Sequence, residues 1–197
     1  LRKEVLSLSY LQLIRDFAPS CEQEAGDQRL MLQLAEPDPD FLLLRQCLHA
    51  HFTPSGLVFN PALDKVLLVH HNIYHTWSWT GGHADGNSDF AEVALREAWE
   101  ETGLRARLLS PQIASLDVLP VFGHIKKGEY VSAHLHLCPS FLLVAEEETP
   151  IVCPEENSGV AWFPLKEVAH ASGEACMIPI YEKLISRAKK LKKESCQ

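Results

Sequence analysis

GGHADGNSDFAEVALREAWEETGL, residues 81–104, joins a glycine-rich turn to a strongly acidic helix. At about 100° per residue, small and apolar side chains share one arc of that helix, namely Ala91, Ala94, Leu95, Ala98, Trp99 and Thr102. Glu97, Glu100 and Glu101 fall on the opposite side. The pattern therefore predicts a helix that packs through its apolar arc and gathers negative charge on its other face.

The three glutamates predict a cation nearby. Like charges three or four residues apart destabilise a helix by roughly a few tenths of a kcal/mol per pair. Mg²⁺ takes oxygen ligands and is usually held by one or two carboxylates together with substrate phosphates. The alternative is a solvated helix face with Arg96 as a local partner. The acidic residues alone leave both interpretations open.

The spacing of the whole stretch resembles the Nudix box. That box is written as Gly, five residues, Glu, seven residues, then Arg-Glu-aliphatic-any-Glu-Glu-any-Gly-aliphatic, which makes it a long and specific motif. The residues in register are Gly82, Arg96, Glu97, Glu100, Glu101, Gly103 and Leu104. Two positions depart from it, because Ser88 stands at the upstream glutamate position and Ala98 at the first aliphatic position.

The resemblance implies a metal-dependent hydrolase of a diphosphate linkage in a nucleoside diphosphate derivative. In the family the box glutamates hold Mg²⁺ or Mn²⁺, and the metal activates water against the diphosphate. Carried over by position, Glu97, Glu100 and Glu101 are the metal ligands and Gly82 offers its backbone carbonyl. Arg96 orients the carboxylates by ion pairing.

Ser88 keeps a second function open. A serine cannot supply the missing carboxylate, so the site is either depleted or rebuilt from a neighbour such as Asp85 or Asp89. A depleted site predicts a catalytically impaired Nudix-fold protein that binds nucleotides or regulates. An intact acidic helix favours the hydrolase.

Five further side chains are candidates for substrate contact. A tryptophan before the glycines could stack on a base, although aromatic residues in strands are more often packing. The histidine beside the glycines could contact phosphate, and two histidines on one strand face could either contact the substrate or serve packing. An acidic residue just before the closing strand resembles the one that the family often brings to the metal or the water. The candidates are Trp79, His83, His134, His136 and Glu156.

Composition limits the partners. The chain has 197 residues, of which 46% are hydrophobic, and a net charge of −8. This charge gives no broad basic surface for nucleic acid, whereas a small phosphate ester could still bind through a metal. No apolar run approaches the ~18 residues of a membrane span, and residues 1–12 lack a signal-peptide pattern. We expect a cytoplasmic protein with a small-molecule nucleoside diphosphate derivative as its partner and no membrane or nucleic-acid partner.

The order of elements predicts an α/β protein of the α+β kind. Helical periodicity covers the first fifty residues, a β pattern follows, and the acidic helix and a terminal helix at 178–193 interrupt and close it. The resemblance implies a Nudix-like α/β/α sandwich with a mixed β-sheet over 51–197. Residues 1–50 form a helical N-terminal extension, which could be a lid, a homodimer contact or added core.

Overall fold

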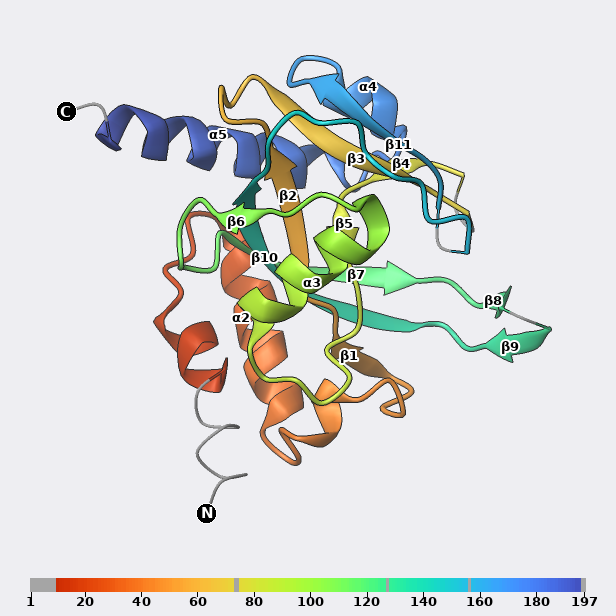
Figure 1. The fold of residues 1–197 in the computed structure, drawn as a ribbon. Coiled ribbons are helices and arrows are strands. Elements are labelled where there is room, and N and C mark those ends of the chain that lie inside the picture. Colours follow the sequence, from red (N-terminus) through yellow and green to blue (C-terminus); the bar gives the residue numbers. More distant parts are fainter. Residues whose placement is uncertain (1–9, 73–74, 127, 156, 196–197) are drawn as a thin grey trace.

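The computed structural model describes residues 10–72, 75–126, 128–155 and 157–195. A mixed β-sheet lies between two layers of helices (Figure 1). The helices are residues 10–16, α2 Glu22–Ala35, the 3₁₀ turn η1 Phe41–Leu43, α3 Phe90–Thr102, α4 Val168–Ser172 and α5 Ile178–Ser195. The strands are β1 Ala50–Phe52, β2 Ser55–Phe59, β3 Lys65–His71, β4 Trp77–Ser78, β5 Thr80–Gly81, β6 Arg107–Leu108, β7 Ser115–Val121, β8 His124–Lys126, β9 Glu129–Val131, β10 His134–Val144 and β11 Asn157–Pro164.

Strand β10 organises the sheet. It runs parallel to β1 and β2 and antiparallel to β6 and β7. The path β1-β10-β2-β3-β11 is completed by antiparallel pairs of β2 with β3 and of β3 with β11. The predicted mixed sheet is therefore confirmed. The β8–β9 hairpin lies apart from this sheet.

Alternation along the strands produces two hydrophobic cores. On β10, Phe141 and Leu143 belong to the core shared with α2 and α3, whereas Leu142 and Val144 belong to the core shared with α5. Successive strand residues point to opposite faces, so one strand serves both layers. Each fully buried Leu or Phe contributes roughly 1.5–3 kcal/mol of transfer free energy. The α/β/α arrangement is thereby confirmed.

The described part of the N-terminal extension packs into the first of these cores. Tyr10 is fully buried, and its ring lies 5.3 Å from Phe52 and 5.2 Å from Phe90, centroid to centroid. The Tyr10 hydroxyl donates a hydrogen bond to the Pro39 carbonyl at 2.7 Å. These residues therefore add to the core, and a domain boundary at residue 51 stays a prediction.

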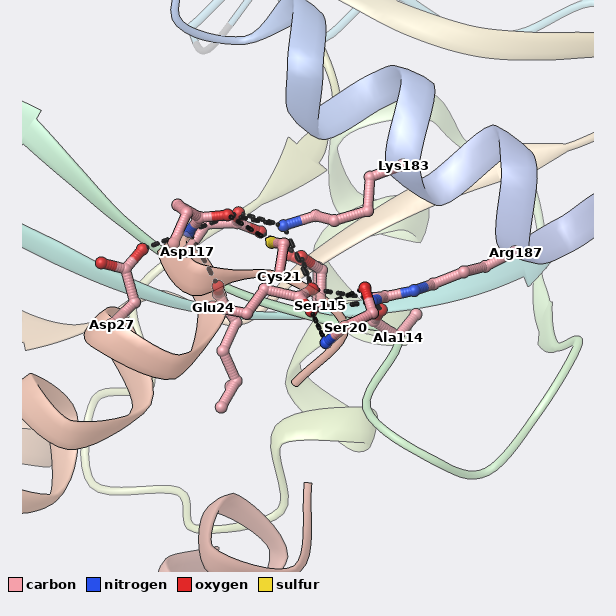
Figure 2. Close-up of polar contacts among 12 residues, drawn as sticks. Ser20, Cys21, Glu24, Asp27, Ala114, Ser115, Asp117, Lys183 and Arg187 are labelled. Carbon is pink, nitrogen blue, oxygen red and sulfur yellow. Dashed lines mark hydrogen bonds and ion pairs between the residues drawn. The ribbon is translucent and has the colours of Figure 1, made fainter. Parts of the chain in front are cut away.

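A buried ion network joins α2, β7 and α5 (Figure 2). We use this name for Glu24, Asp117, Lys183 and Arg187. The two guanidinium nitrogens of Arg187 lie 2.6 and 2.8 Å from the Glu24 carboxylate oxygens, and Lys183 Nζ lies 2.8 Å from Asp117 and 3.1 Å from Glu24. Both carboxylates are almost fully buried. Each buried acid thus meets a cation from α5.

Other features of the fold have local causes. The stretch from Phe52 to Phe59 is two strands rather than one, because Pro54 lies between them and lacks the N–H that a strand ladder requires. The apolar run 41–48 is helical only over η1, and Leu48 is exposed. Within the described residues, the cysteines are free thiols, namely Cys21, Cys47, Cys138, Cys153 and Cys176. Within the described ranges, none of the helices combines the length and apolarity needed to cross a bilayer.

Candidate active site

Helix α3 has well-defined ends. The Asp89 side chain caps its N-terminus by accepting a hydrogen bond from the Glu92 N–H at 3.0 Å. Gly103 ends it with a φ of 70°, a left-handed conformation that suits glycine, and its N–H reaches the Trp99 carbonyl at 2.8 Å. These two caps fix which turns of the acidic stretch are helical.

The predicted packing face of this helix is confirmed for Ala94, Ala98 and Thr102, which are buried, but it is wrong for Trp99 and Glu101. Trp99 is 49% exposed, whereas Glu101 is only 8% exposed. The buried side chains are Phe90, Val93, Ala94, Ala98, Glu101 and Thr102. Glu101 can lie on this face because its carboxylate accepts a hydrogen bond from the Gly81 N–H at 3.0 Å, which compensates for lost hydration. Glu101 and Glu97 therefore face the glycine loop, whereas Glu100 is exposed to solvent.

The glycine loop and α3 touch at Gly82. A Cβ at this position would overlap the Glu97 carboxylate, so this carboxylate can keep its position only beside a glycine. Arg96 donates to Glu97 Oε1 at 2.7 Å and lies 3.8 Å from Glu100 Oε2. The hydrogen bond to Glu97 raises the pKa of Arg96, although burial opposes this change. The predicted pairing of Arg96 with the glutamates is thereby confirmed.

These contacts define the α3 acid cluster, by which we mean Glu97, Glu100 and Glu101. The Glu97 side chain is 14% exposed and that of Glu100 is 45% exposed. The donor set consists of carboxylate oxygens beside a loop from which a side chain is excluded at Gly82. Hard oxygen ligands with partial solvent access fit Mg²⁺ or Mn²⁺.

Both residues that could replace the missing glutamate, Asp85 and Asp89, already make other contacts. Asp89 caps α3, as described above. Asp85 accepts a hydrogen bond from Arg45 Nε at 2.8 Å, and this contact lowers the pKa of its carboxyl group. Both carboxylates therefore have a structural role beside Ser88.

Three predicted histidines meet a fourth that the sequence reading missed. The rings of His134 and His136 lie 4.8 and 5.1 Å from that of His51, and the His83 ring lies 4.9 Å from it. We call these four residues the histidine cluster. Burial lowers the pKa of His51, which is 4% exposed. The register that pairs β1 with β10 sets His51 opposite His136, a long-range contact without a local sequence signal.

Two other candidates do not join the site. Trp79 is 8% exposed, and its ring meets that of Tyr181 at 6.0 Å in the core beneath α5. Its backbone N–H also donates to the Tyr181 hydroxyl at 3.2 Å. Of the two interpretations of Trp79, packing or stacking on a substrate, the structure favours packing, because the ring is covered by the chain itself. Glu156 lies outside the described residues.

The comparison with family models agrees with this geometry. Residues 49–184 match the model described as NUDIX domain. The chain belongs to the NUDIX domain family. The match includes the glycine loop, α3 and all four members of the histidine cluster. It begins near the start of β1, and α2 lies outside it.

Similar proteins are found both by sequence and by structure. The mouse protein "Nucleoside diphosphate-linked moiety X motif 6" is 34% identical over 58 residues, which is 28% of this chain and 18% of that protein. The fold is similar to that of a C. elegans Ap4A hydrolase, with a TM-score of 0.54 and 16% identity over 71% of this chain and 98% of that one. A NUDIX-family hydrolase from Clostridium perfringens gives a TM-score of 0.51 and 20% identity, with 69% and 96% covered. Both similarities cover more than two thirds of this chain and concern its fold.

Proposed function

We propose that this Nudix protein is a metal-dependent pyrophosphohydrolase that cleaves a diphosphate linkage in a nucleoside diphosphate derivative. The observation that carries the proposal is the convergence of the α3 acid cluster on the glycine loop, where Gly81 and Gly82 contact two of the three carboxylates. Family membership and the likeness to an Ap4A hydrolase fold support the same reaction class.

In this proposal the carboxylates bind the metal, and their neighbours position them. Glu97, Glu100 and Glu101 hold Mg²⁺ or Mn²⁺, with the Gly82 carbonyl as a further oxygen ligand. When bound, the ion neutralises the diphosphate and lowers the pKa of the attacking water. Arg96 keeps the Glu97 carboxylate in one orientation through its 2.7 Å hydrogen bond. The buried Gly81 contact does the same for Glu101, so two ligands are held in place before substrate arrives.

A substrate screen tests this function. The purified protein is assayed with Mg²⁺, with Mn²⁺ and with chelator against a panel of nucleoside diphosphate derivatives. We expect cleavage of one class only when metal is present, and a loss of at least about 100-fold in Glu100→Gln. Glu92→Gln is the matched control, because Glu92 is exposed on the same helix and bonds to Asn87 outside the acid cluster. Full activity in Glu100→Gln would contradict the assignment.

A catalytically impaired nucleotide-binding protein is the second candidate. It is favoured by the commitment of Asp85 to Arg45 and of Asp89 to the helix cap, which leaves position 88 without an evident substitute. Its signature is thermal stabilisation by a nucleotide without turnover. Ser88→Glu separates the two functions: a large gain in rate indicates an impaired natural site, whereas an unchanged rate indicates a complete one.

Compartment and self-association complete the proposal. Free thiols fit a reducing compartment such as the cytoplasm.

A homodimer is supported by large hydrophobic side chains that stay exposed at the β8–β9 hairpin, which projects from the body (Figure 1), namely Phe122, Ile125 and Tyr130. Light scattering across a range of concentrations measures the mass, and a monomer at every concentration would exclude the dimer.

A further inference from the structure

The histidine cluster presents ring nitrogens to one another beside the acid cluster. One ring nitrogen from each of His51, His83 and His136 lies within 4.8 Å of the other two. Nitrogens on one tetrahedral Zn²⁺ are about 3.4 Å apart, given a Zn–N distance of about 2.1 Å. Small side-chain rotations therefore bring the three nitrogens to a common ion.

Backbone contacts leave one of these nitrogens ready to act as a ligand. His51 Nδ1 lies 3.1 Å from the Cys47 carbonyl oxygen, and a carbonyl only accepts, so Nδ1 carries the proton. The lone pair of the ring is then on Nε2. This atom is buried and has no hydrogen-bond partner in the described part of the chain. An orphaned acceptor in the interior costs about 1–3 kcal/mol, which a bound cation would offset.

His134 has the same arrangement. Its Nδ1 lies 2.7 Å from the Ser132 carbonyl, which leaves the lone pair on Nε2. That Nε2 accepts a hydrogen bond from His136 Nε2 at 3.2 Å, which places the proton of His136 on Nε2 and its lone pair on Nδ1. Metal-bound histidines commonly donate their second nitrogen to a backbone carbonyl, which fixes both tautomer and ring orientation.

The chemistry selects the kind of ligand. A phosphate oxygen requires N–H donors, but the inward nitrogens of His51 and His134 are acceptors. Imidazole suits Zn²⁺ and similar first-row ions, whereas Mg²⁺ prefers the carboxylate oxygens of α3. We propose that His51, His83 and His136 bind a Zn²⁺-class transition-metal ion at a second site, distinct from the carboxylate site, with His134 as the neighbouring fourth imidazole.

This ion would join three separate parts of the chain. His51 lies on β1, His136 lies on β10, and His83 directly follows Gly82 in the glycine loop. A metal on these residues fixes the loop that contacts Glu97 to the edge of the sheet. The second site therefore supports the geometry of the first without sharing its ligands.

Metal titration of the intact chain tests the proposal. Zn²⁺ binding is measured by calorimetry in excess Mg²⁺, and Co²⁺ is titrated in parallel for its visible absorption. We expect one equivalent of Zn²⁺, a Co²⁺ spectrum typical of nitrogen ligation and a rise in Tm. His83→Gln and His136→Gln should each weaken binding at least about tenfold. His83 lies in a loop, so its variant stays informative if the β10 variant fails to fold.

Two matched variants complete the experiment. His170→Gln removes an exposed histidine of α4 and should bind Zn²⁺ like the original chain. Glu100→Gln, which removes an acid-cluster ligand, should also retain the Zn²⁺ equivalent. Unchanged binding in both His83→Gln and His136→Gln would overturn the proposal, as would loss of the Zn²⁺ equivalent in Glu100→Gln. These readouts do not depend on hydrolysis.

Discussion

The buried ion network and the α3 acid cluster both hold carboxylates against the sheet, but they balance charge differently. In the network, Glu24 and Asp117 meet Lys183 and Arg187, two acids with two bases. In the acid cluster, Arg96 contacts Glu97 and Glu100, while Glu101 is held by a backbone N–H. A balanced and buried network fixes the positions of helices. A carboxylate surplus beside a glycine loop attracts a cation.

A substitution in the buried ion network should cause the largest loss of stability. Arg187→Ala leaves the Glu24 carboxylate buried without its bidentate partner, which we expect to cost about 3–5 kcal/mol of unfolding free energy. Urea unfolding measures the change. The control is Lys190→Ala on the same helix, because Lys190 is 78% exposed and its contact with Glu194 is 3.9 Å long. Equal stability of the two variants would contradict a structural role for the network.

Acid should weaken the same network by a slightly smaller amount. Burial alone would raise the pKa of Glu24, but the hydrogen bonds from Arg187 and Ser20 and the charge of Lys183 lower it from 4.5 to about 2. A lowered folded-state pKa stabilises the fold above pH 4.5, and this contribution of up to about 3 kcal/mol is lost as the pH falls towards 2. Burial raises the pKa of Asp117, which acts in the opposite direction and reduces the net effect.

Unfolding free energies at about pH 6 and about pH 3 measure this loss. Glu24→Gln removes the titrating group and should flatten the pH dependence over that interval. Glu182→Gln changes an exposed glutamate of α5 and is the matched control. A Glu24→Gln chain with the original pH dependence would remove Glu24 as its source.

The acid cluster should respond in function more than in stability. In Gly82→Ala, the new Cβ displaces the Glu97 carboxylate, which is the mobile end of its side chain. We expect Mg²⁺ affinity and turnover to fall at least about tenfold, or about 1.4 kcal/mol, with a change in unfolding free energy below about 1 kcal/mol. Calorimetry and urea unfolding measure the two quantities. A large loss of stability with normal Mg²⁺ affinity would instead assign a structural role to this contact in the α3 acid cluster.

The smallest expected effect is a gain in stability. Gly26 lies in α2, two residues after Glu24, and a Cβ there would meet only the Arg29 side chain at 4.0 Å. Gly26→Ala should therefore stabilise the chain by about 0.5–1 kcal/mol through helix propensity. Thermal unfolding checks the sign. A loss of stability would indicate that α2 bends or shifts around Glu24 in a way that requires glycine.

Local sequence patterns were sufficient for much of the fold. The helical periodicity expected in the first fifty residues includes α2, Glu22–Ala35, and the terminal helix expected at 178–193 is α5, Ile178–Ser195. Residues three and four apart define such helices, so no distant contact is needed to predict them. The spacing of the box likewise identified Gly82, Arg96 and the glutamates together, because they lie within one turn and one helix.

Burial was harder to predict because it depends on distant partners. Trp99 was expected to pack but is 49% exposed, whereas the Trp79 ring is covered because Tyr181 lies across from it. Glu101 is buried because the Gly81 N–H meets its carboxylate. His51 joined the site only through the β1–β10 register. None of these contacts leaves a periodic signal in the sequence.

The buried ion network also makes the packing of α2 depend on a helix that is synthesised much later. Glu24 and its partner Arg187 are separated by 163 positions along the chain. A ribosome makes α2 long before α5, so during translation the Glu24 carboxylate must stay hydrated until the residues around Arg187 have emerged. Burial of that carboxylate without its partners would cost several kcal/mol, so stable docking of α2 onto β7 requires that α5 has been made.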